Sequence, residues 1–237
     1  MIPKIIHICW LGGGKKPKLA ETCAASIKKF CPDWKIVEWN EQNFDIASAP
    51  LYVRQAYDAK KYAFVSDYVR LWALVKHGGV YVDTDVEICR PIDEFLSERA
   101  FSGFETETQI PTGIMACEAG FPLFEEFLRE YDMITFLGED GTQDTTTNVK
   151  RITDICLRHG FTPGGEKQTV EGFTLYPREY FCPFDPATGV LASTKNTAAI
   201  HWFGGSWLSP AQRLRARFAR PFHRIFGKDC FSRLKRK

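Results

Sequence analysis

The sequence predicts an α/β fold in which strands and helices alternate along the chain. KIIHICWL (residues 4–11) is rich in β-branched residues, residues 18–30 have the composition of a helix, and WKIVEW (34–39) is a second β-rich run. This order of elements builds parallel α/β sheets. Because no low-complexity linker and no internal repeat interrupts the 237 residues, we expect a single domain.

A long apolar stretch, KYAFVSDYVRLWALVKH (61–77), predicts the next helix, and the two glycines that follow predict its end. Nearly every position is apolar, so we expect this helix to be buried on all sides. Its polar exceptions, Ser66, Asp67 and Arg70, share one narrow stripe. Further along, we expect strands at 112–119, 173–177 and 198–203 and helices at 121–135 and 145–159.

The composition, 44% hydrophobic and 25% charged, is typical of a soluble chain with one substantial core. No window approaches the roughly 20 apolar residues of a membrane-spanning helix, and the interrupted apolar N-terminus indicates a first strand rather than a signal peptide. We therefore expect a cytoplasmic protein. The eight cysteines lack a C-x-x-C pair and lie in apolar contexts, which favours reduced buried thiols over zinc ligands or disulfides: Cys9, Cys23, Cys31, Cys89, Cys117, Cys156, Cys182 and Cys230.

The net charge of +2 conceals an uneven distribution along the chain. Residues 213–237 carry ten Lys and Arg against one acid, Asp229, so this tail has a charge of +9 and the remainder has −7. A nucleic-acid-binding protein would spread basic charge over its folded face, so we expect no nucleic-acid partner. We expect a folded domain over residues 1–212 and a separate basic tail over 213–237.

Two aspartates two residues apart, Asp83 and Asp85, follow a run of β-formers in GGVYVDTDVEI (78–88). Two carboxylates about 4 Å apart oppose joint ionisation by roughly 4 kcal/mol at an effective dielectric of about 20, and a divalent cation between them removes that cost. Oxygen ligands suit Mg²⁺ or Mn²⁺. An EF-hand loop is excluded because the chain has Glu87, Ile88 and Cys89 where a third acid and a glycine are needed. The haloacid-dehalogenase phosphatases require Thr or Val at the position of Glu87.

FVSDYVRLWALVKHGGVYVDTDVEICRPID (64–93) resembles the signature block of the DXD-containing sugar transferases, glycosyltransferase family 32, which is related to the glucosylating domain of the large clostridial toxins. IPKIIHICWLGG (2–13) resembles the first strand of these enzymes, and HWFGGSW (201–207) resembles their C-terminal metal-and-phosphate loop. The resemblance implies a GT-A fold with a mixed, mostly parallel central sheet. The nucleotide-sugar is then expected across the carboxyl ends of the strands.

The resemblance assigns donor-binding roles to residues before and within the DXD block. Trp10 matches the tryptophan that stacks on the nucleotide base, although a core tryptophan at a strand end is the alternative. Asp67 and Arg70 match the pair that contacts the ribose and the donor sugar; a structural ion pair is their alternative. Asp83 matches the aspartate directed at ribose and metal, and Asp85 matches the direct metal ligand. Tyr81 lies on the same strand face and is a weaker candidate for packing the donor.

The C-terminal loop completes the expected site. His201 is a candidate third metal ligand, because imidazole binds Mn²⁺, and a hydrogen-bonded core histidine is the alternative. The hydroxyl of Ser206 and the indole N–H of Trp207 are expected to donate to the β-phosphate of the donor.

The resemblance implies retaining transfer of a hexose from UDP-galactose or UDP-glucose to an acceptor hydroxyl, with Mn²⁺ or Mg²⁺ and Asp83 and Asp85 as the catalytic pair. No second carboxylate stands out as a nucleophile; the side chains that line the sugar pocket are expected from among Glu105, Glu107, Asp144 and Asn148. Two other functions remain open. The same DXD serves a metal-dependent phosphohydrolase, and a noncatalytic carbohydrate-binding module would retain the fold.

The basic tail also carries apolar residues at helical spacing. Leu214, Phe218, Phe222, Ile225 and Phe226 recur among Arg213, Arg215, Arg217, Arg220, Arg224 and Lys228, and we expect Pro221 and Gly227 to break the helix into short pieces. Such a stretch favours an anionic membrane surface. We therefore expect a peripheral enzyme on the inner face of the membrane, acting on a glycolipid or lipid-linked polysaccharide. The alternative is a last helix whose phenylalanines close the core beneath a solvated basic face.

Overall fold

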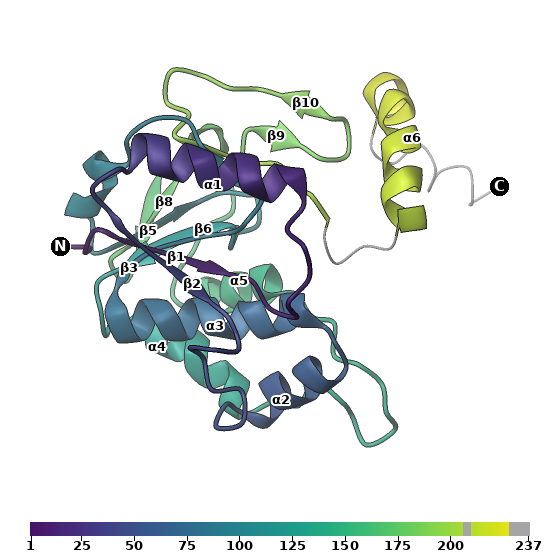
Figure 1. Cartoon of the computed structure of the whole chain (residues 1–237). Helices are drawn as coiled ribbons and strands as arrows, with labels where there is room; N and C mark the ends of the chain where they lie inside the picture. Colours follow the sequence, from purple (N-terminus) through teal and green to yellow (C-terminus); the bar gives the residue numbers. More distant parts are fainter. Residues whose placement is uncertain (206–209, 228–237) are drawn as a thin grey trace.

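A computed structural model describes residues 1–205 and 210–227 and confirms the α/β class (Figure 1). Within these residues, a seven-stranded sheet has the order β2-β1-β3-β6-β5-β8-β7. Strands β6 and β7 run antiparallel to their neighbours and the other five point the same way, so the sheet is mixed and mostly parallel. The strands are β1 (Ile5–Cys9), β2 (Lys35–Trp39), β3 (Gly79–Val82), β5 (Ala100–Gly103), β6 (Ile114–Cys117), β7 (Gln168–Val170) and β8 (Phe173–Tyr176).

Helices cover both faces of this sheet. Helix α1 lies over one face, and α3, α4 and α5 lie on the other, with α2 beyond α3 (Figure 1). Their bounds are α1 (Lys18–Phe30), α2 (Leu51–Asp58), α3 (Tyr62–His77), α4 (Pro122–Arg129) and α5 (Asn148–Arg158), with short 3-10 turns η1 (Asp93–Ser97), η2 (Glu130–Asp132) and η3 (Arg178–Tyr180). The predicted helices at 18–30 and 61–77 are therefore confirmed as α1 and α3.

Two small sheets and a last helix lie outside the central sheet. Strand β4 (Val86–Ile88) pairs antiparallel with β11 (Ala199–His201), and β9 (Phe184–Asp185) pairs with β10 (Val190–Leu191). Helix α6 (Pro210–Phe226) lies beside the β9–β10 hairpin (Figure 1). The sequence patterns did not predict α2, β4 or β5, because these elements are short and their apolar positions are few.

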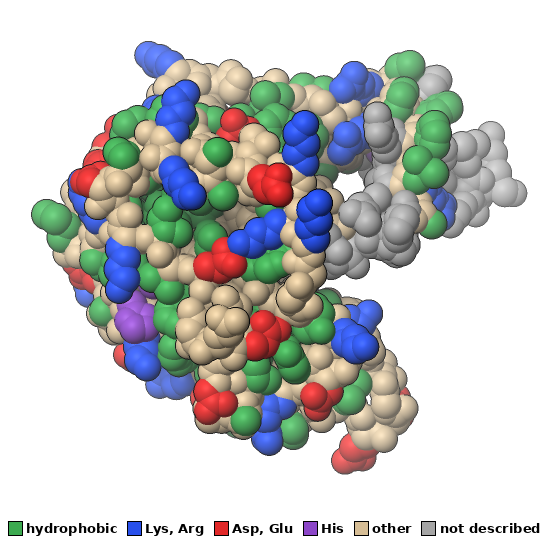
Figure 2. Space-filling model, viewed as in Figure 1, with side chains coloured by type: hydrophobic (Ala, Val, Ile, Leu, Met, Phe, Trp, Pro, Cys, Tyr) green, Lys and Arg blue, Asp and Glu red, His purple; other side chains and the backbone are tan. Residues whose placement is uncertain are grey.

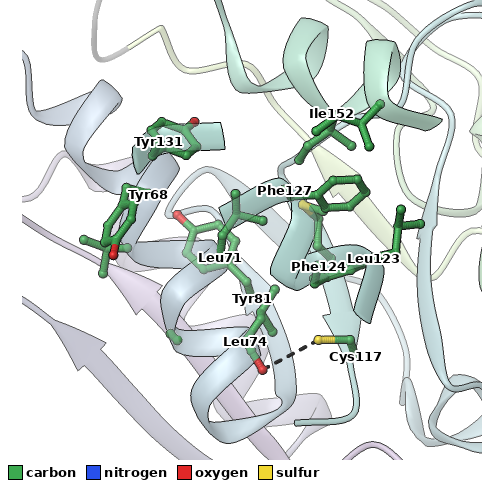
Figure 3. Packing of buried hydrophobic residues seen from close by; sticks show 14 of the residues in the cluster. Tyr68, Leu71, Leu74, Tyr81, Cys117, Leu123, Phe124, Phe127, Tyr131 and Ile152 are labelled. Atoms are coloured by element: carbon green, nitrogen blue, oxygen red, sulfur yellow. Dashed lines mark hydrogen bonds between the residues drawn. The ribbon is translucent and has the colours of Figure 1, made fainter. Parts of the chain in front are cut away.

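The sheet separates two apolar clusters because successive side chains of a strand point to opposite faces. In β3, Val80 and Val82 belong to the α1-side cluster, whereas Tyr81 belongs to the α3-side cluster. The α3-side cluster contains residues of α3, α4 and α5 packed against the strands, and Figure 3 shows Leu71 and Leu74 of α3 beside Phe124 and Phe127 of α4. The residue after Val82, Asp83, continues this alternation and is therefore directed to the α3 side.

The turn between α3 and β3 depends on two adjacent glycines, as the sequence predicted. Gly78 ends the helix with φ +63° and Gly79 has φ +108°, values in the left-handed region that glycine adopts without strain. A Cβ at Gly78 would also lie 2.7 Å from the backbone nitrogen of Ala119. The two glycines thus let the chain turn from a buried helix directly into the next strand.

Helix α6 differs from the prediction at Pro221. The helix continues through this proline and ends only before Gly227, whose φ is +82°. A proline inside a helix removes one hydrogen bond, but here the side chains around it donate to the β9–β10 turn: Arg220 Nε to Pro186 O at 3.1 Å and Arg224 Nε to Thr188 O at 2.6 Å. The expected break at Pro221 is therefore wrong.

The described cysteines are free thiols, and all except Cys89 are buried: Cys9, Cys23, Cys31, Cys117, Cys156 and Cys182. Cys230 lies outside the described residues. In the part of the chain that the structure describes, no helix has both the length and the apolar character needed to cross a bilayer.

His7 of β1 is a buried neutral imidazole that ties three elements together. Its Nε2 donates to Gly78 O at 2.8 Å, and its Nδ1 accepts from the indole of Trp39 at 3.1 Å. With 1% of the residue exposed, burial lowers the pKa of His7 from 6.5 to about 4. Folding therefore opposes protonation of this ring.

We expect the free energy of unfolding to fall as the pH drops from 6.5 towards 4, because His7 binds a proton more readily in the unfolded chain. A shift of this size corresponds to about 3 kcal/mol, fully present above pH 6.5 and lost below about pH 4. Urea unfolding across this range measures it. His7→Gln is the matched control, since it retains a donor and an acceptor without titrating; parallel pH profiles of the two proteins would contradict the assignment.

Candidate active site

The DTD segment forms the turn between β3 and β4, at the carboxyl end of the central strands. The N–H of Val86 donates to Asp83 O at 3.0 Å across this turn, and the N–H of Asp83 donates to Gly113 O at 2.8 Å, one step beyond the β3–β6 ladder. The backbone of the turn is thereby fixed to β6. The prediction that a turn brings the two aspartates together is realised, since their carboxylates belong to one three-residue cluster with His201.

A buried guanidinium joins α3 to this turn. Arg70, whose side chain is 5% exposed, contacts Asp67 Oδ1 at 2.9 Å and Asp83 Oδ1 at 3.3 Å through Nη2, and its Nη1 donates to Thr112 O at 2.7 Å. Asp67 lies three residues before Arg70 on the polar stripe that the sequence indicated. Burial raises the pKa of Asp67 to about 6, and also raises that of Asp83, although Arg70 opposes both shifts. The ion pair that is the structural alternative for Asp67 and Arg70 is therefore present, and their contact with a donor stays a prediction.

Tyr81 is placed beneath the network rather than at its surface. It is 1% exposed, its hydroxyl donates to Asp83 Oδ1 at 2.7 Å, and the guanidinium of Arg70 lies 4.7 Å above the ring centroid. These contacts assign Tyr81 to holding Asp83 and Arg70 in position.

Asp85 connects the turn to the C-terminal segment. Its main-chain oxygen accepts from Trp202 N at 2.9 Å, and its Oδ2 accepts from Gly204 N at 2.7 Å. The other carboxylate oxygen lies 3.4 Å from His201 Nε2. Burial by itself would raise the pKa of Asp85, but the hydrogen bond and charge of His201 and the N–H of Gly204 together outweigh burial and lower that pKa. One oxygen of Asp85 is thus committed to the backbone while the other faces the imidazole.

His201 ends β11, and pairing with β4 brings it beside the DTD turn. Its side chain is 14% exposed, and Nδ1 is buried without a hydrogen-bond partner. Burial opposes a charge on the ring, but Asp85 raises the pKa of His201 to about 10. Nε2, the ring nitrogen that faces the carboxylate of Asp85, is the atom placed to bind a cation beside the two aspartates.

The three predicted metal ligands are brought together by the fold. Asp83, Asp85 and His201 each offer a ligand atom, and these atoms lie within 4.8 Å of one another. Two carboxylates and one imidazole are ligands that suit Mn²⁺, so the residues present fit a divalent cation.

Trp10 lies in the loop after β1, which is the strand beside β3. Its ring is partly exposed, and its indole N–H donates to Gly14 O at 2.7 Å within the same loop. Glu41 accepts from the N–H of Gly12 at 2.6 Å, and Tyr62 packs so closely on Gly12 that a Cβ there would lie 2.2 Å from its ring. The loop that carries Trp10 is therefore held at two points.

The remaining candidates for the sugar pocket differ in their contacts with the site. Glu105 is partly buried and interacts electrostatically with His201 and Asp83, whereas Glu107 is exposed. Asp144 pairs with Arg151, and Asn148 Nδ2 donates to Asp67 O at 3.3 Å. Ser206 and Trp207 lie outside the described residues, so their phosphate-binding role stays a prediction.

Sequence analysis missed three residues that touch this site: Gly113, Phe203 and Gly204. A Cβ at Gly204 would lie 3.3 Å from Asp85 Oδ2, and one at Gly113 would lie 2.8 Å from His201 Nδ1. The ring of Phe203 stacks on His201 with centroids 3.9 Å apart. The sequence carried no signal for Gly113, because nothing local links it to a histidine far along the chain.

Residues 17–102 match the family described as the glycosyltransferase sugar-binding region containing the DXD motif. Over 142 residues the chain is 29% identical to inositol phosphoceramide mannosyltransferase 3 of Schizosaccharomyces pombe, covering 57% of this chain and 38% of that protein. It is 27% identical over 217 residues to an uncharacterized glycosyltransferase of Acanthamoeba polyphaga mimivirus, covering 82% of both. The chain thus spans well under half of the yeast enzyme and most of the viral protein.

The fold is also similar to that of a solved glycosyltransferase, PaToxG. The TM-score is 0.50 at 16% identity, covering 66% of this chain and 68% of the other. At that identity the similarity concerns the fold alone.

We expect Arg70→Met to destabilise the protein by about 3 to 5 kcal/mol, because it leaves the carboxylates of Asp67 and Asp83 buried without a cation. Urea unfolding at neutral pH measures the loss. The double variant Asp67→Asn/Arg70→Met is the control and is expected to recover part of the stability, since only one buried charge remains. A loss below about 1 kcal/mol in Arg70→Met would show that the network contributes little to folding.

Proposed function

The chain belongs to the DXD-containing glycosyltransferases, and from this premise we propose that it transfers a hexose, with retention of configuration, from a nucleoside diphosphate to a hydroxyl of a lipid-linked acceptor. The observation that carries the proposal is the convergence of Asp83, Asp85 and His201, distant in sequence, at the carboxyl end of β3. Ligands of open α/β sheets bind at this edge.

The donor is held by residues around the DTD turn. Trp10 offers a partly exposed ring beside β3 for the nucleotide base, and we propose uridine as that base. Asp67 and Arg70 contact the ribose and the donor sugar. We propose that Ser206 and Trp207 donate hydrogen bonds to the β-phosphate; both follow Gly204 in the sequence, and the N–H of Gly204 donates to Asp85.

The proposed ligands of a divalent cation, Mn²⁺ or Mg²⁺, are Asp83, Asp85 and His201. When bound, such a cation supplies Lewis-acid stabilisation of the diphosphate leaving group. The chain's own contribution is preorganisation: Arg70 and Tyr81 hold Asp83, and the N–H of Gly204 holds Asp85.

Apart from Asp83 and Asp85, no carboxylate among the described residues forms a hydrogen bond or ion pair with His201 that would place it as a covalent nucleophile. Glu105 is our candidate carboxylate for the sugar pocket, because it interacts electrostatically with Asp83 and His201. We therefore favour attack on the same face as the departing phosphate, which needs no second carboxylate.

A lipid acceptor is supported by the orientation of α6. Its arginines 220 and 224 turn towards the β9–β10 hairpin, and Arg220 also lies 5.5 Å from the ring centroid of Phe184. Apolar side chains on the helix stay exposed, and Figure 2 shows such side chains gathered along its outer side: Leu214 is 55%, Phe218 69% and Ile225 73% exposed. The alternative expectation is a helix whose phenylalanines close the core. Phe218 does not do so, because its side chain is exposed.

The neighbouring hairpin extends this surface with Val190 and Leu191, which are 47% and 41% exposed. Residues 186–228 contain no Asp or Glu but several Lys and Arg, so an anionic bilayer complements the surface in charge as well as in apolarity. The yeast relative is named for transfer of mannose to inositol phosphoceramide, an acceptor that is itself a lipid.

We expect donor turnover to require a divalent cation and an intact DTD turn. Wild-type protein with Mn²⁺ is tested against UDP-galactose, UDP-glucose and GDP-mannose for release of nucleoside diphosphate and for its increase on adding acceptor. Chelation with EDTA and the variant Asp85→Asn should each abolish turnover. Glu125→Gln, which changes an exposed carboxylate of α4 that has no proposed role in the site, is the control and should leave turnover intact. Full turnover in excess EDTA would refute the metal role, and release of inorganic phosphate without sugar transfer would favour a phosphohydrolase.

We expect the full chain to sediment with anionic phosphatidylglycerol vesicles at low salt and to be released at high salt. Replacing Leu214, Phe218 and Ile225 together by Ser should reduce binding already at low salt, because it removes the burial of apolar side chains while leaving the charge of the chain unchanged. Met133→Ser removes an apolar side chain elsewhere that is even more exposed, at 85%, and should have no effect on binding. A full chain that stays in the supernatant while glycosylating a soluble sugar efficiently would remove the support for a lipid acceptor.

A further inference from the structure

The imidazole of His201 rests directly on the backbone of Gly113. A Cβ built at Gly113 would lie 2.8 Å from Nδ1, 3.0 Å from Cε1 and 3.2 Å from Cγ of this ring. All three of the nearest atoms belong to His201. Any side chain at position 113 must therefore displace the imidazole or be displaced by it.

The backbone conformation at Gly113 does not itself require glycine. The φ of Gly113 lies outside the left-handed region, whereas Gly78 and Gly205 both lie inside it. Alanine can adopt such a conformation without strain. The nearest obstacles to a side chain at this position are thus atoms of the histidine ring, so the contact can be tested separately from the folding of the strand.

Phe203 supplies the second contact with the ring. Its centroid lies 3.9 Å from that of His201 with the planes 22° apart. Phe203 reaches this place with φ +51°, a conformation that costs a non-glycine residue of order 1 to 2 kcal/mol. A strained residue that stacks on a candidate ligand is typical of a functional constraint, because packing alone rarely selects this backbone.

The segment that supports His201 also fixes the other side of the site. The carbonyl of Gly113 accepts from Asp83 N at 2.8 Å, and the carbonyl of Thr112 accepts from Arg70. The Ser102 hydroxyl holds the flanking carbonyls of Pro111 and Ile114 at 3.2 and 2.8 Å. One short rigid segment therefore sets the distance between Asp83 and the imidazole.

We propose that Gly113 and Phe203 are positioning residues. They hold the His201 ring where it can bind the same cation as Asp83 and Asp85. The inference rests on the proposed role of His201 as a metal ligand. Residues that orient a metal ligand without touching the metal typically change affinity by about 10- to 100-fold when altered. Gly113→Ala shifts the ring by a fraction of an ångström, so we expect an effect of about 10-fold.

The test is a double-mutant cycle read out as the Kd for Mn²⁺ alone, obtained from electron paramagnetic resonance of free Mn²⁺ without donor or turnover. The proteins are wild type, Gly113→Ala, His201→Ala and the double variant. Gly113→Ala should weaken Mn²⁺ binding about 10-fold in the wild-type background and not at all in the His201→Ala background, where the ring is absent. Phe203→Leu should weaken binding, whereas Phe203→Tyr should retain it, because only the latter preserves the stacked ring.

The possible results are distinct. Unchanged Mn²⁺ affinity in Gly113→Ala, with a clear loss in His201→Ala, overturns the positioning role but leaves the proposed ligand set intact. Equal losses from Gly113→Ala in both backgrounds also overturn it. Wild-type affinity in His201→Ala overturns the ligand role and the inference with it. If Gly113→Ala also lowers the midpoint of thermal unfolding by pressing on the ring, the double variant should unfold at the same temperature as His201→Ala, because the ring is absent from both. A lower midpoint in the double variant would refute the contact.

Discussion

The guanidinium of Arg70 is the interaction on which the rest of the site depends. It is almost completely buried and bonds at once to a carboxylate of its own helix, to Asp83 of the DTD turn and to the carbonyl of Thr112. Burial of a charge is costly unless every partner is in place, so the three contacts are mutually dependent. Helix α3, the turn after β3 and the segment before β6 are therefore fixed relative to one another before any ligand binds.

The second constraint is the attachment of the C-terminal segment to the same turn. Trp202 donates its main-chain N–H to Asp85 O and its indole N–H to Glu87 Oε2, and Gly204 donates to the Asp85 carboxylate. Residues more than a hundred positions apart thus form one polar cluster. Because Asp85 binds this segment with both backbone and side chain, the DTD turn serves the architecture of the site as well as its chemistry.

Helix α6 shows how tertiary contacts choose between two interpretations of one amphipathic pattern. Arginine side chains have a forked donor geometry that suits carbonyl oxygens exposed at a tight turn, and the β9–β10 turn offers several: Arg224 alone donates to Thr188 O and Gly189 O. These bonds orient the helix with basic residues towards the hairpin. The apolar side chains of Leu214, Phe218 and Ile225 are consequently exposed to solvent.

The sequence by itself determined the features that depend on neighbouring residues: the alternation of strands and helices, the polar stripe at Asp67 and Arg70, the stop at Gly78, and two aspartates after a buried strand. Backbone periodicity and local sterics determine these features, so they can be predicted from the sequence without a structure. Only the tertiary structure decided that His201 rests on Gly113, that Tyr81 lies beneath the network, and that α6 passes through Pro221 unbroken. These depend on which surfaces fit together across long separations, where side-chain shape and hydrogen-bond geometry outweigh local preference.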